Sequence, residues 1–72
     1  MDMRRLVGRN VRRIRQEKGL TQEQLAEISG FSQQYISGLE QGQRNPTIVS
    51  LYELATALDV SHMELVSPTE ED

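Results

Sequence analysis

The sequence predicts an all-α domain of five helices. Apolar residues recur at helical spacing in its longer segments, no window alternates apolar and polar residues as a strand would, and Gly, Ser and Thr separate the helical segments. A chain of 72 residues has room for one domain. We expect this domain to occupy residues 1–66, and residues 67–72 to form an acidic, frayed tail.

The first helix is predicted over Met3–Lys18. Its apolar residues Val7, Val11 and Ile14 follow the spacing i, i+4, i+7 and therefore form one stripe. Gly19 is expected to end the helix as its C-cap.

Two short helices follow around a glycine turn. Thr21 and Gln24 have the spacing of a capping box, which begins the second helix. Gly30 is expected to take the left-handed conformation at the turn, and Ser32 to cap the third helix.

A fourth helix is predicted after Pro46, with Thr47 as its cap. Ser61 and Glu64 are expected to form a second capping box, at the start of a last short helix. The inward face of the fourth helix is predicted to carry Ile48, Leu51, Leu54, Ala55 and Leu58.

Residues 22–41 have the form of a helix-turn-helix, in which a turn of about three or four residues joins two short helices. Ala26 is small where such helices cross closely, and the core positions are assigned to Leu25, Phe31, Ile36 and Leu39. The outer face of the third helix then carries Gln33, Gln34, Ser37 and Gly38. Because a Gln amide can bond both N6 and N7 of adenine, this face favours reading of DNA bases over simple solvation.

These residues resemble the phage-repressor and Cro-like helix-turn-helix family, also called the xenobiotic-response-element family. The resemblance covers residues 7–65 and rests on Gly19, Leu20, Thr21, Gln22, Leu25, Ala26, Gly30, Phe31, Ser32, Ile36, Ser37, Glu40, Gly42, Arg44 and Pro46. It implies a compact five-helix domain and a sequence-specific DNA-binding regulator of transcription that is not an enzyme. The run from Tyr35 to Glu40 is also similar to controller proteins of restriction–modification systems, although prophage and chromosomal regulators share most of these residues.

The resemblance also implies which residues meet double-stranded DNA. The third helix would enter the major groove, and its base-reading residues would be Gln33, Gln34, Tyr35, Ser37 and Gly38. Phosphate contacts are implied for Gln22, Ser32, Gln41, Gln43, Arg44 and Asn45. Arg15 and Glu40 would form an ion pair between the first and third helices. Gly38 costs about 1 kcal/mol relative to Ala inside a helix, which a close approach of the DNA backbone would justify.

Charge is distributed unevenly along the chain. Residues 1–18 carry seven of the eight basic side chains and two acidic ones, whereas residues 19–72 carry one basic and nine acidic side chains. This asymmetry indicates a basic face and an acidic remainder, although a solvated helix face would give the same count.

Several classes of protein are disfavoured. The chain has no Cys and one His, which excludes disulfides and makes a zinc site implausible. No Gly-rich phosphate loop and no acidic pair beside a nucleophile occurs, so we expect no cofactor, metal or small-molecule ligand. No apolar run approaches the ~20 residues of a membrane helix and no secretory signal is recognisable, so a cytoplasmic location is expected.

We expect a homodimer, formed by the last helix and the adjoining end of the fourth. The residues assigned to the interface are Tyr52, Met63, Leu65 and Val66, because they would otherwise expose apolar surface. Such a dimer would bind a roughly palindromic operator. The alternative is a protein-interaction module, such as an antitoxin or anti-repressor, which the acidic composition beyond residue 18 would suit.

Overall fold

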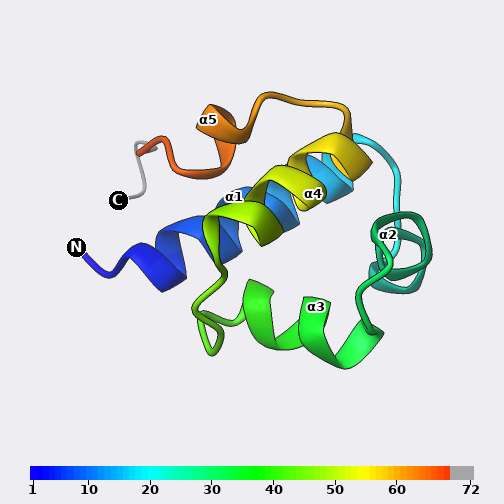
Figure 1. Ribbon diagram of the computed structural model, residues 1–72, viewed down its shortest axis with the longest axis horizontal. Coiled ribbons are helices and arrows are strands. Elements are labelled where there is room, and N and C mark those ends of the chain that lie inside the picture. Colours follow the sequence, from blue (N-terminus) through cyan, green and yellow to red (C-terminus); the bar gives the residue numbers. More distant parts are fainter. Residues whose placement is uncertain (69–72) are drawn as a thin grey trace.

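The computed structural model describes residues 1–68, which form five helices and no strand: α1 (Met3–Glu17), α2 (Gln22–Ser29), α3 (Gln33–Glu40), α4 (Ile48–Leu58) and α5 (His62–Leu65) (Figure 1). The all-α prediction is therefore confirmed. Residues 67 and 68 are exposed and outside any helix, and the rest of the expected tail, residues 69–72, lies outside the described residues. No helix within the described range is long and apolar enough to span a membrane.

Side-chain caps fix where the helices begin. The Thr21 hydroxyl accepts a hydrogen bond from the Gln24 backbone N–H at 3.0 Å, while the Gln24 side chain accepts one from the Thr21 N–H at 2.9 Å. This is the predicted capping box. Ser32 and Thr47 each accept a backbone N–H from the first turn of α3 and α4. At the turn between α2 and α3, Gly30 has the expected left-handed conformation, with φ 84°.

The link from α4 to α5 departs from prediction in one detail. α4 ends at Leu58 and is followed by its C-cap Asp59, which adopts the left-handed conformation with φ 58°. Ser61 then caps α5 by accepting the backbone N–H of Met63 at 3.2 Å. The predicted capping box with Glu64 is wrong, because α5 has only four residues and its cap bonds two positions ahead.

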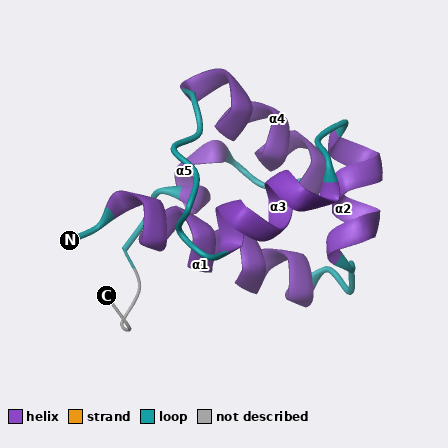
Figure 2. Cartoon of the chain, turned by 90° about the horizontal axis from the view of Figure 1, so that it is seen from below, coloured by secondary structure: helices purple, strands orange, loops and turns teal. Residues whose placement is uncertain are grey.

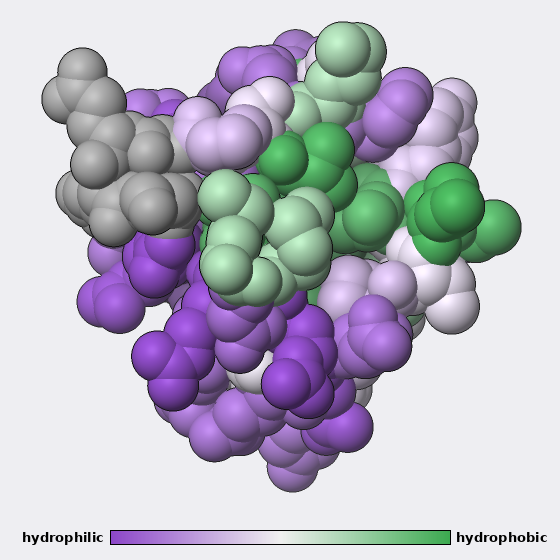
Figure 3. Space-filling model, turned by 90° about the vertical axis from the view of Figure 1, so that its left-hand side faces the viewer, coloured by the Kyte–Doolittle hydropathy of each residue, from purple (hydrophilic) through white to green (hydrophobic). Residues whose placement is uncertain are grey.

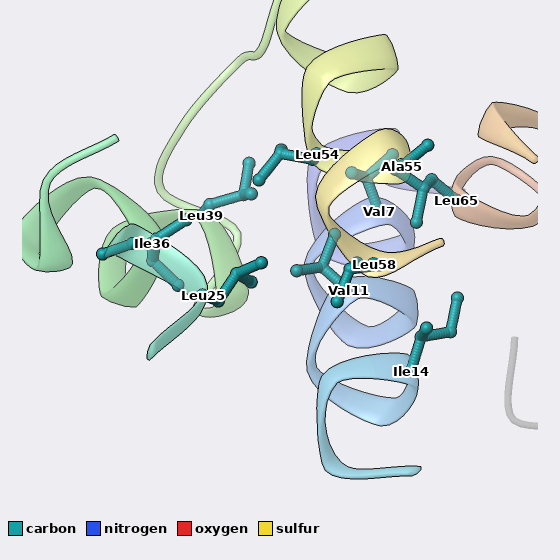
Figure 4. Close-up of a cluster of buried hydrophobic side chains, with 11 residues drawn as sticks. Val7, Val11, Ile14, Leu25, Ile36, Leu39, Leu54, Ala55, Leu58 and Leu65 are labelled. Carbon is teal, nitrogen blue, oxygen red and sulfur yellow. The ribbon is translucent and has the colours of Figure 1, made fainter. Parts of the chain in front are cut away.

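The core lies where the inner faces of all five helices meet (Figure 4). Its largest members are Val7, Val11, Ile14, Leu25, Ile36, Leu39, Leu54, Leu58 and Leu65. The predicted stripe of α1 is thus buried. Ile48, however, is 85% exposed, so its assignment to the inward face of α4 is wrong. It is the first residue of that helix and no other element covers it.

Leu65 is also placed differently from the prediction. It is fully buried in the core of its own chain, so its assignment to a dimer interface is wrong.

Asn10, which was not predicted to have a structural role, holds this end of the chain to α1. Its side-chain amide donates to the carbonyl oxygens of Leu65 at 3.0 Å and Ser67 at 2.9 Å, and its oxygen accepts from Arg13 at 3.3 Å.

α3 occupies one side of the molecule and packs against α1 and α2. Seen from that side, it lies between α1 and α4, with α2 beside its N-terminal end (Figure 2). Gly8 of α1 allows the close approach, because a Cβ there would collide with the carbonyl oxygen of Leu39. The opposite side of α3 faces outward.

Candidate nucleic-acid interface

The outward face of α3 is polar and accessible. Gln33 and Gln34, the first two residues of the helix, are exposed, and Ser37 one turn later is half-buried. Gln22, at the start of α2, borders the same open hollow as these three residues. The fold thus places the start of α2 beside the outward face of α3, so that Gln22 lies on the same surface as Gln33 and Gln34.

A buried ion pair fixes the orientation of α3. The Arg15 guanidinium donates through Nε to Glu40 Oε2 at 2.7 Å and through Nη2 to Oε1 at 3.1 Å, and the two side chains are 10% and 3% exposed. Arg15 Nη1 also donates to the carbonyl oxygen of Leu20 at 2.7 Å. Gln22 Nε2 donates to Glu40 Oε1 at 3.0 Å, so α1 and α2 are both tied to the C-terminal end of α3.

Gly38 lies beside Arg44 in the fold. A Cβ at this position would lie 3.1 Å from Nε and 3.4 Å from Cγ of Arg44. The Arg44 guanidinium carbon lies 5.7 Å from the centre of the Tyr35 ring, which in turn stacks on Phe31 with 4.8 Å between ring centres. The missing side chain of Gly38 therefore makes room for Arg44, the only basic residue beyond position 18.

The remaining residues assigned to phosphate lie at the two ends of α3. Gln41, Gln43 and Asn45 are exposed in the loop that leads to α4. This loop is held in place because the backbone N–H of Gln43 donates to the carbonyl oxygen of Gly38 at 2.9 Å. Ser32 is exposed at the other end, where its oxygen accepts the N–H of Tyr35, which leaves the hydroxyl proton available to a phosphate oxygen.

Apolar side chains are exposed on α4 and α5, away from the polar face of α3. Of the residues assigned to a dimer interface, Tyr52, Met63 and Val66 are 62%, 65% and 36% exposed. Ile48 and Val49, which were not predicted to lie at this surface, are also exposed, and they line an open hollow with Tyr52 and His62. Figure 3 shows hydrophobic surface on the upper and right parts of one face, above a hydrophilic lower part.

The chemistry that this surface offers is hydrogen bonding and positive charge. It consists of amides and hydroxyls around α3 and one guanidinium over its C-terminal half. Within residues 1–68, no group of three or more His, Asp or Glu side chains could hold a metal ion.

The chain is similar in sequence to proteins named as regulators or control proteins. A regulator from Sinorhizobium fredii, the uncharacterised HTH-type transcriptional regulator y4dJ, is 68% identical over 71 residues, which is 99% of this chain and 92% of the relative. The control protein C.SmaI from Serratia marcescens is 43% identical over 67 residues, covering 93% of this chain and 80% of its own.

Solved structures agree with this similarity. The restriction–modification controller protein C.AhdI from Aeromonas hydrophila superposes with a TM-score of 0.83 at 45% identity, over 86% of this chain and 94% of its own. The controller protein C.Esp1396I, solved as a tetramer with its natural 35-base-pair operator, gives a TM-score of 0.82 at 40% identity, over 90% and 86% of the two chains. The helix-turn-helix family HTH_3 matches residues 11–65, and the chain belongs to this family, the xenobiotic-response-element type of transcriptional regulator.

Proposed function

We propose that the protein is a homodimeric regulator of transcription that binds a roughly palindromic operator with α3 in the major groove. The observation that carries this proposal is the exposed amide pair Gln33 and Gln34 at the start of a helix whose orientation a buried ion pair fixes. The N-terminal residues of a recognition helix are those that reach base edges. The operator complex of C.Esp1396I, at 40% identity, supports the same activity here.

The proposal assigns each group by its position on α3. Gln33 and Gln34 read bases, with Tyr35, Ser37 and Gly38 close to the bases or the backbone. The groups proposed to bind phosphate are Gln22, Ser32, Gln41, Gln43, Arg44 and Asn45. Gln22 suits this role because it stands at the N-terminus of α2, where free backbone N–H groups and the helix dipole favour an anion.

The test compares Gln33→Ala and Gln34→Ala with the wild type on a DNA duplex selected by the wild-type protein, on its single-base variants and on random DNA. Loss of one bidentate amide–base contact is expected to cost about 1–3 kcal/mol at one operator position. Binding to random DNA should stay nearly unchanged, because phosphate contacts dominate it. Since both side chains are exposed, stability should change by less than about 0.5 kcal/mol.

If both variants keep the wild-type preference at every base pair, α3 does not read sequence. A wild-type protein that selects no duplex at all would favour the alternative, a protein-interaction module that uses the same fold. The proposed activity is binding without catalysis, and a DNA-binding regulator of this family would act in the cytoplasm.

A further inference from the structure

Apart from Arg15, the basic side chains of α1 take no part in the interface described so far. Arg5, Gly8, Arg12 and Arg15 follow one another at three, four and three residues, so they share one stripe of the helix. Two members show which way this stripe faces. Gly8 approaches the carbonyl oxygens of Leu39 and Glu40, and Arg15 pairs with Glu40. The stripe therefore faces the C-terminal end of α3.

Arg5 stands beside the loop that is proposed to bind phosphate. A Cβ on Gly42 would lie 2.9 Å from Cγ and 3.3 Å from Cα of Arg5, so the two residues are packed together. Gly42 separates Gln41 from Gln43, both of them assigned to phosphate. The Arg5 side chain is nevertheless 73% exposed, and its ion pair with Asp2 is long, at 3.9 Å. Its guanidinium is thus available on the surface next to the loop.

Arg12 occupies the same stripe between Gly8 and Arg15. Its side chain is exposed, and it has no ion pair or hydrogen bond with any other residue of the range 1–68. Arg13, by contrast, lies on the side of α1 that faces α5. It donates to Asn10 and pairs with Glu17 at 3.5 Å. The two neighbouring arginines therefore point to different surfaces.

We infer that Arg5 and Arg12 bind backbone phosphates of the DNA strand that flanks α3 on the side of α1. This inference rests on the proposed function, because it takes α3 to lie in the major groove. That groove is about 12 Å wide, close to the diameter of one helix, so the elements on either side of α3 meet the two phosphate rows. α1 lies on one side of α3 (Figure 2), and guanidinium groups match phosphate oxygens in geometry and charge.

These contacts would also explain how a chain with a net charge of −3 binds a polyanion. Its acidic side chains lie almost entirely beyond residue 18, so the positive charge is concentrated on the helix that borders the groove.

Near the N-terminus, Asp2 is the one acid among these arginines. Desolvation of its carboxyl opposes ionisation, but hydrogen bonds from the backbone N–H groups of Arg4 and Arg5 and the charges of both residues outweigh it, and the pKa of Asp2 is lowered.

The experiment measures binding of Arg5→Gln, Arg12→Gln and the double variant at several salt concentrations, on the selected duplex and on random DNA. Arg13→Gln is the matched control, with the same change of charge on the other side of α1. Each stripe variant is expected to flatten the slope of log K against log salt by about one unit per protomer on both DNAs, and the double variant by about two. The control should keep the wild-type slope, and base preference should stay unchanged in every variant.

Wild-type slopes in Arg5→Gln and Arg12→Gln would overturn the inference, as would an equal loss in Arg13→Gln, since net charge rather than the stripe would then be responsible. Either result leaves the proposed function standing if Gln33→Ala and Gln34→Ala still lose base preference. The proposed function fails separately, if the wild type prefers no duplex over random DNA.

Discussion

Glu40 receives more polar contacts than any other side chain of the recognition helix. Arg15 binds both of its carboxylate oxygens, and Gln22 adds a hydrogen bond from the start of α2. Because Glu40 is the last residue of α3, these contacts fix the end of the helix that lies farthest from Gln33 and Gln34. The orientation of the Gln33 and Gln34 side chains thus depends on Glu40, which lies at the other end of α3.

Removing Glu40 should destabilise the whole domain. Glu40→Ala leaves the buried Arg15 guanidinium without its counter-charge, which costs on the order of 3–5 kcal/mol. At roughly 0.05–0.15 kcal/mol per residue, a small domain such as this one has a low total stability, so the substitution should remove a large part of its free energy of unfolding. Urea denaturation followed by circular dichroism measures the change. Glu23→Ala, at an exposed position of α2, is the control, and a midpoint equal to that of the control would contradict the prediction.

Gly38 is expected to affect stability and DNA binding in opposite directions. Gly38→Ala should stabilise α3 by up to about 1 kcal/mol through helix propensity. The added methyl group would lie 3.1 Å from Arg44 Nε, so the Arg44 side chain must shift, and binding to all DNA should weaken. If Gly38 acts through Arg44, the same substitution should change nothing in an Arg44→Ala background.

Thermal denaturation and salt titrations of the two single variants and the double variant test this. Arg44→Ala alone should weaken all duplexes about equally and flatten the salt slope by about one unit per protomer. A further loss of affinity in the double variant would show that the Gly38 backbone meets DNA directly.

At the scale of the helices, the sequence predicted where elements begin better than which faces they bury. Caps such as Thr21, Ser32 and Thr47 bond residues within one turn, so the information for a helix start is local. Burial depends on distant segments. Ile48 shares the apolar spacing of Leu54 and Leu58, but no other element covers the first residue of α4. Leu65 is buried because α5 packs against α1 and α4, which nearby spacing does not predict.

The candidate site shows the same limit. The outward position of Gln33 and Gln34 follows from the buried spacing of Ile36 and Leu39, and it is visible in the sequence. The pairing of Arg15 with Glu40 came from family resemblance alone. The role of Asn10 cannot be predicted from local sequence, because its partner Leu65 is 55 residues away and a lone Asn in a basic helix gives no local signal.

α5 should depend on Asn10 for its position. A helix of four residues cannot persist without tertiary contacts. Asn10→Ala removes two hydrogen bonds to the chain around α5 and leaves two carbonyl groups unpaired, at a cost of about 1–3 kcal/mol for a buried group. Amide hydrogen exchange in residues 62–67 should accelerate more than in α3. Ser67→Ala, which removes an exposed hydrogen bond to Met63, should have a smaller effect. Uniform acceleration across all helices would mean that Asn10 stabilises the fold globally instead.

The molecule has one polar and one apolar surface, and they lie on different helices. The polar one follows α3, and the apolar one, here called the apolar face, is formed by Ile48, Val49, Tyr52, Met63 and Val66. Leu65 is buried and does not belong to the predicted interface, but Ile48 and Val49 add exposed apolar side chains at the start of α4. An exposed apolar patch of this kind marks an interaction site, and a two-fold contact through it would pair two copies of α3 on one duplex.

The apolar face is therefore predicted to hold the homodimer. The wild type should sediment as a dimer at micromolar concentration, whereas Tyr52→Asp should sediment as a folded monomer, because Tyr52 is 62% exposed and contributes little to the core. Gln33→Asp places the same charge on α3 and should remain dimeric.

In the dimer the two recognition helices are expected about 34–36 Å apart, which is one turn of DNA. Inserting five base pairs between the operator half-sites should therefore abolish cooperative binding by the wild type. For Tyr52→Asp, whose half-sites are bound independently, the same insertion should have no effect. A wild type that stays monomeric with and without DNA would rule out this assembly, and a dimeric Tyr52→Asp would move the interface elsewhere.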